Sequence, residues 1–311
     1  MAGLLKKKFL GFNVAVATPR KLPNASKLNG RVVILDLAFA HSKPSGSFPS
    51  ITHKLINQLG ERLALFLDHH DSDFHEDFAG NPKFILATKA EHGACPEMIT
   101  EELVEQTGAV DTILCHGDFD GLASAAKWIL GGVEPYDGCD HDAWCIDTRL
   151  EAPSQIGMVF DRALRANLKD DGIKELVLNA LLTRLVDKTV LSTLKRVGQE
   201  VKILEENAEE LAQSYQHLNP QVAFLDVRHT HLDYDKTHLL LCGQQQAQIA
   251  VLRTEQAITF AAPFNSGLNF LKLFQVSGGM PTVISLAPHR LRGALVLLGI
   301  EASIAARLAK D

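Results

Sequence analysis

The stretch LALFLDHHDSD, residues 63–73, places an apolar run directly before an acid, two consecutive histidines and two further acids. A short apolar run of this kind is typical of a strand that is buried inside a sheet. The carboxylate and imidazole groups that follow it are the side chains from which proteins build metal sites. The stretch therefore predicts a ligand site at the end of a buried strand.

Two other predicted strands end in residues of the same kind. Residues 31–39, RVVILDLAF, form an apolar, β-branched run with a carboxylate near its end, and residues 111–118, DTILCHGD, form another. In parallel α/β sheets, ligands sit beyond the carboxyl ends of the strands, so we expect the side chains at these three ends to converge. They are Asp36, Asp68, His69, His70, His116, Asp118 and Asp120.

The converging groups would form a mixed oxygen and nitrogen donor set. Such a set suits Mn²⁺, Mg²⁺, Co²⁺ or Zn²⁺ better than it suits metals that prefer thiolates. Asp36 or Asp120 could bridge two ions about 3.5–4 Å apart, the arrangement that clamps the attacking and leaving oxygens in phosphoryl transfer. A single acid at a strand end usually caps a helix or a turn. The recurrence of ligand-type residues at three strand ends is what indicates a site.

Strands and helices alternate along the first part of the chain. Strands are expected over 31–39, 63–70, 82–88 and 111–118, and helices over 51–61, 96–108 and 121–132. Gly108 suits the end of its helix. This alternation predicts an α/β domain with a mainly parallel sheet.

The composition and periodicity of the sequence change after this domain. Residues 133–150 are rich in Gly, Asp and Pro and are expected to form a loop, and 151–216 have a helical pattern. Short strand-like runs return from Pro220 onward, at 222–227, 238–245, 248–254, 257–263 and 282–288. We therefore expect a catalytic domain over 1–150, a helical connector over 151–218 and a smaller α/β domain over 219–311.

Composition narrows the function classes. The net charge is −6 and the only lysine block is Lys6–Lys8, whereas proteins that grip long nucleic acids usually show a basic footprint. The five cysteines are scattered, which predicts free thiols and a cytoplasmic location. No apolar run approaches the roughly 18–20 residues of a membrane helix, so no membrane partner is expected.

Two motifs resemble those of a known family. The DHH sequence at 68–70, after a strand, and HGDFDGLASAA at 116–126, entering a helix, are similar to the signature motifs of the DHH phosphoesterase superfamily. That superfamily includes RecJ-type exonucleases, nanoRNA and pAp phosphatases, cyclic dinucleotide phosphodiesterases and family II inorganic pyrophosphatases. The last hundred residues resemble its DHHA1-type substrate-binding domain. The resemblance implies a metal-dependent phosphoesterase, in which Mn²⁺, or Mg²⁺ or Co²⁺, is bound as a pair of ions.

The chain departs from the family pattern in two ways. The 116–126 motif normally opens the chain, but here it follows the other two, which a circular permutation of the sheet would explain. The C-terminal loop SGGMP, residues 277–281, has Met280 where the family usually has histidine. Methionine lacks the hydrogen-bonding capacity of an imidazole, so a different substrate preference is expected.

The resemblance also implies roles for the residues at the strand ends. Asp36 would be the bridging carboxylate, and His69 would ligate one of the ions. His70 would face the scissile phosphate as an electrostatic or general-acid group, with Asp68 orienting a histidine. His116, Asp118 and Asp120 would divide between the two ions.

The family has one further metal-binding Asp, for which the sequence offers two candidates. Asp147 follows a short apolar run and is near Arg149, a candidate phosphate anchor, whereas Asp187 lies within a helical pattern. Asp147 is the preferred candidate. Gly278 and Gly279 could cradle a phosphate through their backbone N–H groups. Residues 139–145, CDHDAWC, lack the ligand spacing of a zinc finger, so no structural zinc is expected there.

The small accessory domain and the acidic net charge favour a short substrate. Candidates are a short single-stranded oligonucleotide, a nucleoside bisphosphate or a cyclic dinucleotide. The alternative is a nucleotide-binding or sensor protein of the same fold with a degraded site, an idea that rests on Met280. The sequence leaves open which phosphoester is cut and whether the chain forms a homodimer.

Overall fold

The computed structural model describes residues 3–40, 47–167, 169–276 and 281–310. The chain divides into two compact units, Met1–Gln199 and Glu200–Asp311. This division falls inside the stretch expected to be a connector, whose first helices belong to the first unit. None of the helices within the described ranges is long and apolar enough to span a bilayer.

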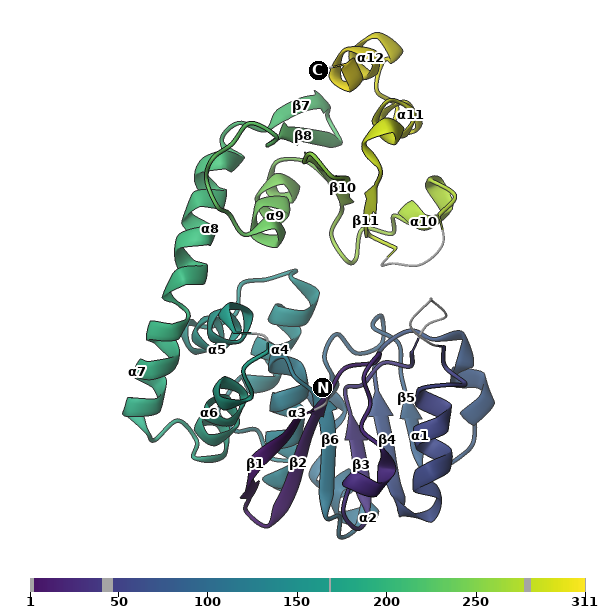
Figure 1. Ribbon diagram of the computed structural model, residues 1–311, viewed down its shortest axis with the longest axis vertical. Coiled ribbons are helices and arrows are strands. Elements are labelled where there is room, and N and C mark those ends of the chain that lie inside the picture. The colour runs from purple at the N-terminus through teal and green to yellow at the C-terminus, as the bar shows by residue number, and fades with distance from the viewer. Residues whose placement is uncertain (1–2, 41–46, 168, 277–280, 311) are drawn as a thin grey trace. The chain divides into compact units, whose positions relative to one another are not determined.

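The first unit is an α/β fold around a six-stranded sheet with the order β1-β2-β6-β3-β4-β5 (Figure 1). All neighbouring pairs except β1 and β2 are parallel. The predicted fold class, an α/β domain with a mainly parallel sheet, is therefore confirmed. The strands are β1 (Gly3–Phe9), β2 (Phe12–Ala17), β3 (Val32–Leu35), β4 (Leu63–Asp68), β5 (Phe84–Leu86) and β6 (Thr112–His116).

The β1–β2 hairpin is the part of this sheet that the sequence did not predict. Its two strands are joined by Leu10 and Gly11, which both have positive φ (46° and 96°), as a tight turn between twisted strands requires. β2 pairs with β6 in parallel. The N-terminal segment thus extends the sheet from β6, and no periodic signal in the sequence indicated this pairing.

Alternate strand residues face two separate hydrophobic cores, because successive side chains of a strand point to opposite sides of the sheet. Val33, Leu35 and Leu67 pack on the side of α3 (Phe119–Ile129). Ile34 and Phe66 pack on the other side, against α1 (Thr52–Leu59). Burial on both faces explains why these strands read as continuous apolar runs.

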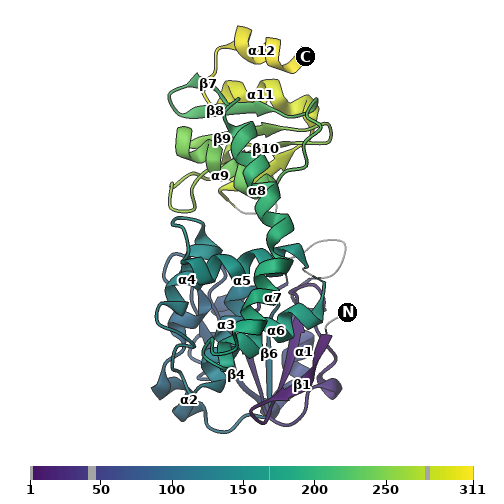
Figure 2. The same ribbon diagram turned by 90° about the vertical axis from the view of Figure 1, so that its left-hand side faces the viewer.

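Helices complete the first unit. Figure 2 shows α3, α5, α6 and α7 packed together, as their mutual contacts also indicate. Besides α1 and α3, this unit contains α2 (Glu101–Thr107), α4 (Cys139–Thr148), α5 (Gln155–Ala166), α6 (Asp171–Leu182) and α7 (Lys188–Val197).

The prediction of a loop over 133–150 was wrong for most of its length, because α4 occupies Cys139–Thr148. The helix starts after Gly138 and ends at Arg149, both in the left-handed conformation. Cys139, Ala143 and Ile146 are buried and belong to the core around α3. Tertiary burial of this face stabilises a helix whose four acidic and hydroxyl-bearing residues gave it a loop-like composition.

The second unit contains a five-stranded sheet with the order β11-β10-β9-β8-β7, in which only β8 and β9 are parallel. Residues 238–245 were predicted as strand-like but lie in helix α9. Asp235 caps the N-terminus of this helix, because its side chain accepts a hydrogen bond from the His238 N–H group. The strands of the second unit are β7 (Gln216–Asn219), β8 (Val222–Asp226), β9 (Ile249–Arg253), β10 (Ile258–Ala261) and β11 (Val283–Leu286). Its helices are α8 (Gln199–Ala212), α9 (Lys236–Gln246), α10 (Phe270–Leu273), α11 (Leu291–Leu297) and α12 (Ala302–Lys310).

Candidate metal centre

Three adjacent parallel strands deliver the candidate ligands to one edge of the sheet. β3 lies between β6 and β4, and Leu35 pairs with both Leu67 and Cys115. The next residue of each strand therefore emerges at the same level of the sheet edge. These residues are Asp36, Asp68 and His116. Sequence order does not matter for this convergence, because it depends only on which strands are neighbours.

Asp36 lies at the middle of the centre in an unusual backbone conformation. Its φ is 52°, a left-handed value that is uncommon for residues other than glycine and is tolerated best by Asn and Asp. Its N–H group still donates to the carbonyl of Leu67, at 3.0 Å. The side chain is 1% exposed, and within the described residues neither carboxylate oxygen has a hydrogen-bond donor. A buried carboxylate of this kind is costly unless a cation compensates it.

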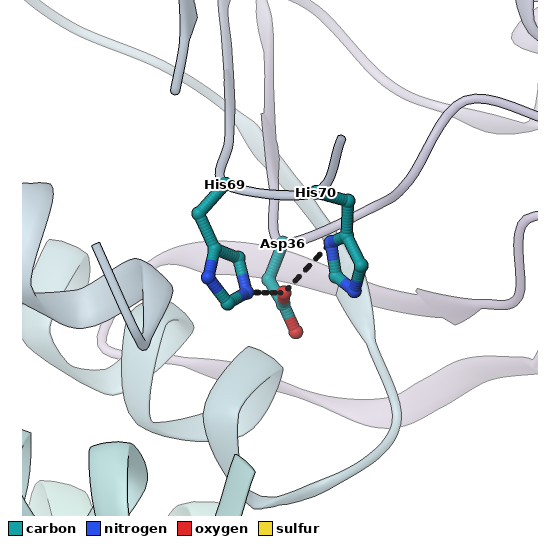
Figure 3. Close-up of side chains that lie close together, drawn as sticks. All are labelled: Asp36, His69 and His70. Carbon is teal, nitrogen blue, oxygen red and sulfur yellow. Dashed lines mark ion pairs between the residues drawn. The ribbon is translucent and has the colours of Figure 1, made fainter. Parts of the chain in front are cut away.

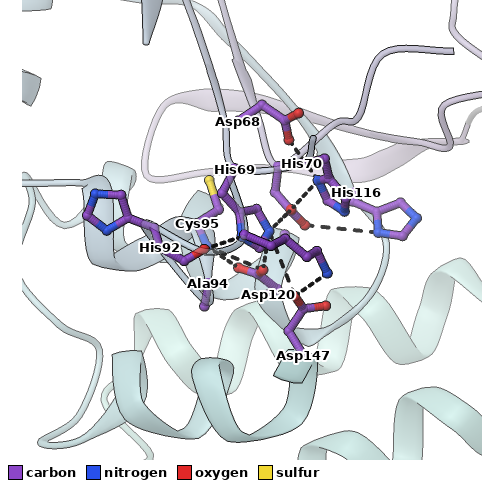
Figure 4. Close-up of polar contacts among 12 residues, drawn as sticks. Asp68, His69, His70, His92, Ala94, Cys95, His116, Asp120 and Asp147 are labelled. Atoms are coloured by element: carbon purple, nitrogen blue, oxygen red, sulfur yellow. Dashed lines mark hydrogen bonds and ion pairs between the residues drawn. The ribbon is translucent and has the colours of Figure 1, made fainter. Parts of the chain in front are cut away.

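His69 is surrounded by carboxylates on one side of its ring (Figures 3 and 4). Its Nε2 atom lies 3.3 Å from Asp36 Oδ1, 3.1 Å from Asp120 Oδ2 and 3.9 Å from Asp147 Oδ2. These are ion-pair distances, but none has hydrogen-bond geometry. On the other side, Nδ1 lies 2.9 Å from the carbonyl oxygen of His92, to which it can donate. That bond holds the ring with Nε2 facing the carboxylates, the usual arrangement of a metal-binding histidine.

His70 has a different environment from that of His69. Its Nδ1 atom lies 2.9 Å from Asp68 Oδ1 and 3.8 Å from Asp36 Oδ1. Its side chain is 29% exposed, whereas His69 is fully buried. Asp68 can accept a hydrogen bond from the Nδ1–H group and so orient the ring, which leaves Nε2 available for another partner.

The 116–126 motif supplies candidate ligands from the end of β6 and the start of α3. His116 Nδ1 lies 2.7 Å from Asp118 Oδ2 and 4.0 Å from Asp36 Oδ2. Asp118 is also the N-cap of α3, because its Oδ1 accepts from the Gly121 N–H group. A Cβ at position 121 would lie 2.6 Å from the His116 carbonyl oxygen, so only glycine allows this tight turn. Asp120 accepts from the Cys95 N–H group at 3.0 Å.

These side chains form three groups whose candidate ligand atoms lie within 4.8 Å of one another. The groups are Asp36 with His69 and His70, Asp36 with His116 and Asp118, and His69 with Asp120 and Asp147. Asp36 belongs to two of them and His69 to two. The donor set contains only oxygen and nitrogen, and its central carboxylate lacks hydrogen-bond donors. The residues present therefore fit one or two hard divalent cations.

The electrostatics of the centre also show that its carboxylates require positive charge. Burial, followed by the charge of Asp118, raises the pKa of Asp36. Burial lowers the pKa of His69, but Asp120 and Asp36 outweigh it and raise the value to about 11. Burial also opposes protonation of His116, yet Asp118 raises its pKa to about 9. Without a metal, therefore, the histidines themselves supply the positive charge that the carboxylates require, and a metal must displace their protons.

The two candidates for the last aspartate have different environments. Asp147, from α4, lies within the His69 group and accepts from Lys89 Nζ at 2.5 Å. Asp187 is the N-cap of α7 and accepts from the N–H groups of Thr189 and Val190. Asp147 thus belongs to a group of candidate ligands, and Asp187 has the ordinary role of a helix cap.

Of the predicted substrate-binding residues, the structure describes Arg149. The guanidinium group of Arg149 donates to both carboxylate oxygens of Asp161, at 2.9 and 3.2 Å. It is therefore engaged in an ion pair, and its side chain is 30% exposed. Gly278, Gly279 and Met280 lie outside the described residues.

Two residues of the centre were missed from the sequence. Lys89 follows β5, the strand next to β4, and its side chain is 14% exposed beside Asp147. His92 contributes a backbone carbonyl, which no side-chain pattern can reveal. Lys89 comes directly after a predicted strand, as Asp36, Asp68 and His116 come at the ends of theirs, and this position was a usable signal.

Comparison with known proteins gives distant structural likenesses. The chain is similar to the pGpG-specific phosphodiesterase PggH from Vibrio cholerae, with a TM-score of 0.48 and 12% identity, over 90% of this chain and 99% of that one. It is also similar to the exonuclease RecJ bound to manganese, with a TM-score of 0.45 and 13% identity, over 89% of this chain and 75% of that one. No family model matches, and no curated protein matches.

Both likenesses are distant. Neither protein's substrate or metal transfers to this chain on that ground.

Proposed function

We propose that the chain is a divalent-metal-dependent phosphoesterase that hydrolyses short nucleotides, such as an oligonucleotide, a nucleoside bisphosphate or a cyclic dinucleotide. The observation that supports this most directly is Asp36. Its carboxylate is buried and shared by two groups of candidate ligands, and both oxygens lack hydrogen-bond donors among the described residues. A bridging carboxylate between two divalent cations has this environment.

The candidate ligands would hold two cations, Mn²⁺ being the preferred ion, with Mg²⁺ or Co²⁺ as alternatives. Asp36 would bridge them, His69, Asp120 and Asp147 would hold one, and His116 and Asp118 the other. When bound, such a pair lowers the pKa of a water molecule toward neutrality and neutralises phosphate oxygens.

The protein's own side chains would orient and protonate the substrate. The hydrogen bond from His69 Nδ1 to the His92 carbonyl keeps Nε2 turned toward the carboxylates. Asp68 holds the ring of His70 through Nδ1, and the pKa of His70 is raised because Asp68 and Asp36 outweigh the effect of burial. His70 is thus suited to hold a proton on Nε2 and to give it to the leaving oxygen.

The test is Mn²⁺-dependent hydrolysis of bis-p-nitrophenyl phosphate, followed by a panel of dinucleotides, cyclic dinucleotides and nucleoside bisphosphates. We expect turnover that requires metal and is lost in His69→Ala. His217→Ala is the matched control, because His217 is an exposed histidine of the second unit and should leave activity unchanged.

Absence of turnover on every substrate, with nucleotide binding still measurable, would contradict the proposal. That result would favour the alternative, a nucleotide sensor that has lost catalysis.

A further inference from the structure

A second group of ligand-type side chains lies at the surface end of α4, outside the centre described above. It consists of His141, Cys145 and Glu151, and one candidate ligand atom from each lies within 4.8 Å of the others. It has the one candidate sulfur ligand among the groups found in the described residues. Sulfur, nitrogen and oxygen together are a different donor set from the oxygen and nitrogen set around Asp36.

The local backbone explains how the three residues meet. His141 and Cys145 are four residues apart in α4, so their side chains lie on the same face of the helix. The helix ends at Arg149, whose left-handed conformation (φ 58°) reverses the chain direction. This reversal returns Glu151 to the side of His141, whose Nε2 lies 3.6 Å from Glu151 Oε2.

The distances are close to those between ligands of one metal ion. The Nε2 atom of His141, which would be the nitrogen ligand, lies 3.9 Å from Cys145 Sγ and 3.6 Å from Glu151 Oε2. Tetrahedral zinc with its usual bond lengths places sulfur, nitrogen and oxygen ligands about 3.4–3.6 Å apart. Small movements of the imidazole and carboxylate would therefore satisfy one ion.

Exposure differs in a way that suits an open site. Cys145 is buried, and the side chains of His141 and Glu151 are 61% and 62% exposed. The two exposed side chains can thus close over an ion that approaches from solvent, while the sulfur is held on the helix. Three protein ligands leave a fourth position for water.

We propose that His141, Cys145 and Glu151 form a second metal site, selective for a thiophilic divalent cation, with Zn²⁺ as the natural occupant. Binding exchanges the Cys145 S–H bond for a metal–sulfur bond and releases the proton to solvent. A bound ion would clamp the C-terminal turn of α4 to the segment that follows it. Asp147 lies in that same turn, but the site itself does not depend on the function proposed for the first centre.

Cobalt provides a specific test, because thiolate-to-cobalt charge transfer gives a near-ultraviolet absorption band that oxygen and nitrogen ligands do not produce. The full-length protein would be titrated with Co²⁺ under reducing conditions. We expect the band in the wild type and in Cys242→Ser, the control for a half-buried cysteine of the second unit, and its loss in Cys145→Ser.

A second variant covers the case in which Cys145→Ser folds poorly. His141 is exposed, so His141→Ala should fold normally and weaken Zn²⁺ binding at this site at least tenfold, as measured by competition with a chromogenic chelator. Absence of the band in the wild type, or its persistence in Cys145→Ser, would overturn the proposal. The hydrolysis assay is a separate readout, so failure of either proposal can be recognised independently of the other.

Discussion

The Nζ atom of Lys89 lies 2.5 Å from Oδ2 of Asp147, which places a half-buried ammonium group beside the His69, Asp120 and Asp147 cluster. The pKa of Lys89 is raised, because Asp147, Asp120 and Asp36 together outweigh the opposing effect of burial. Lys89 is therefore charged under ordinary conditions and competes with a cation for Asp147.

Removing the charge of Lys89 should strengthen metal binding. We expect Lys89→Met to tighten Mn²⁺ binding by about tenfold, because a neighbouring positive charge near a partly solvated site costs on the order of 1–4 kcal/mol. The measurement is a titration of free Mn²⁺ by electron paramagnetic resonance. Lys89→Arg keeps the charge and should bind Mn²⁺ like the wild type. Weaker binding in Lys89→Met would show that Lys89 supports the ligands instead of competing with the ion.

Asp36→Asn tests the bridging position with little disturbance of the backbone. Asparagine tolerates the left-handed conformation at this residue, so the variant should fold. Mn²⁺ at about 100 times its Kd should raise the Tm of the wild type by about 5–10 °C and that of Asp36→Asn by far less. Asp77→Asn, which alters an exposed acid, should keep the full response. An undiminished shift in Asp36→Asn would exclude this carboxylate as a ligand.

The two candidates for the last aspartate can be separated by the same substitution. Asp147→Asn should weaken Mn²⁺ binding by about tenfold or more, because it removes the charge of a group beside His69. Asp187→Asn should leave binding unchanged, since asparagine caps a helix as well as aspartate does. Isothermal titration calorimetry gives both affinities. The opposite pattern would transfer the ligand role to Asp187.

His69 and His70 are adjacent in sequence, but substitutions at the two positions should have different effects on catalysis and on metal binding. His70→Asn should lower kcat by roughly 10²-fold or more, with a change in Mn²⁺ affinity of less than about threefold, because a general acid acts on the substrate. His69→Asn should instead lose Mn²⁺ binding, since Nε2 of His69 lies among three carboxylates. Parallel loss of metal binding in both variants would make His70 a ligand.

Asp161 has a structural role that should be visible as pH-dependent stability. Burial would raise its pKa, but Arg149 and Arg165 outweigh that effect and lower it. Its contribution is therefore fully present above the unfolded-state pKa of about 3.9 and is lost as the pH falls toward the lowered folded-state value.

We expect Asp161→Asn to reduce the free energy of unfolding by about 1–3 kcal/mol at pH 7. Urea unfolding at pH 7 and at pH 3 would measure this difference, which should shrink at the lower pH. A difference that is the same at both pH values would mean that the charge of Asp161 is not what stabilises α5.

The sequence by itself determined the buried strands and the residues that follow them. The apolar runs at 32–35, 65–67 and 113–115 are buried on both faces, and this makes their pattern continuous and easy to recognise. The acids and histidines directly after these runs were therefore identifiable as candidate ligands. The N-cap role of Asp118 and the glycine at position 121 are likewise local features of the chain.

Only the tertiary structure decided the remaining features, because they depend on contacts between residues far apart in sequence. The pairing of β3 with both β4 and β6 brings the three motifs together, and a sequence gives no strand order. Residues 139–148 have a loop-like composition but become a helix when one face is buried against α3. That helix brings Asp147 to Lys89 and His69, at a separation of 58 residues for the first pair. Short-range propensity cannot encode such a contact, since its stability comes from the packing of the whole unit.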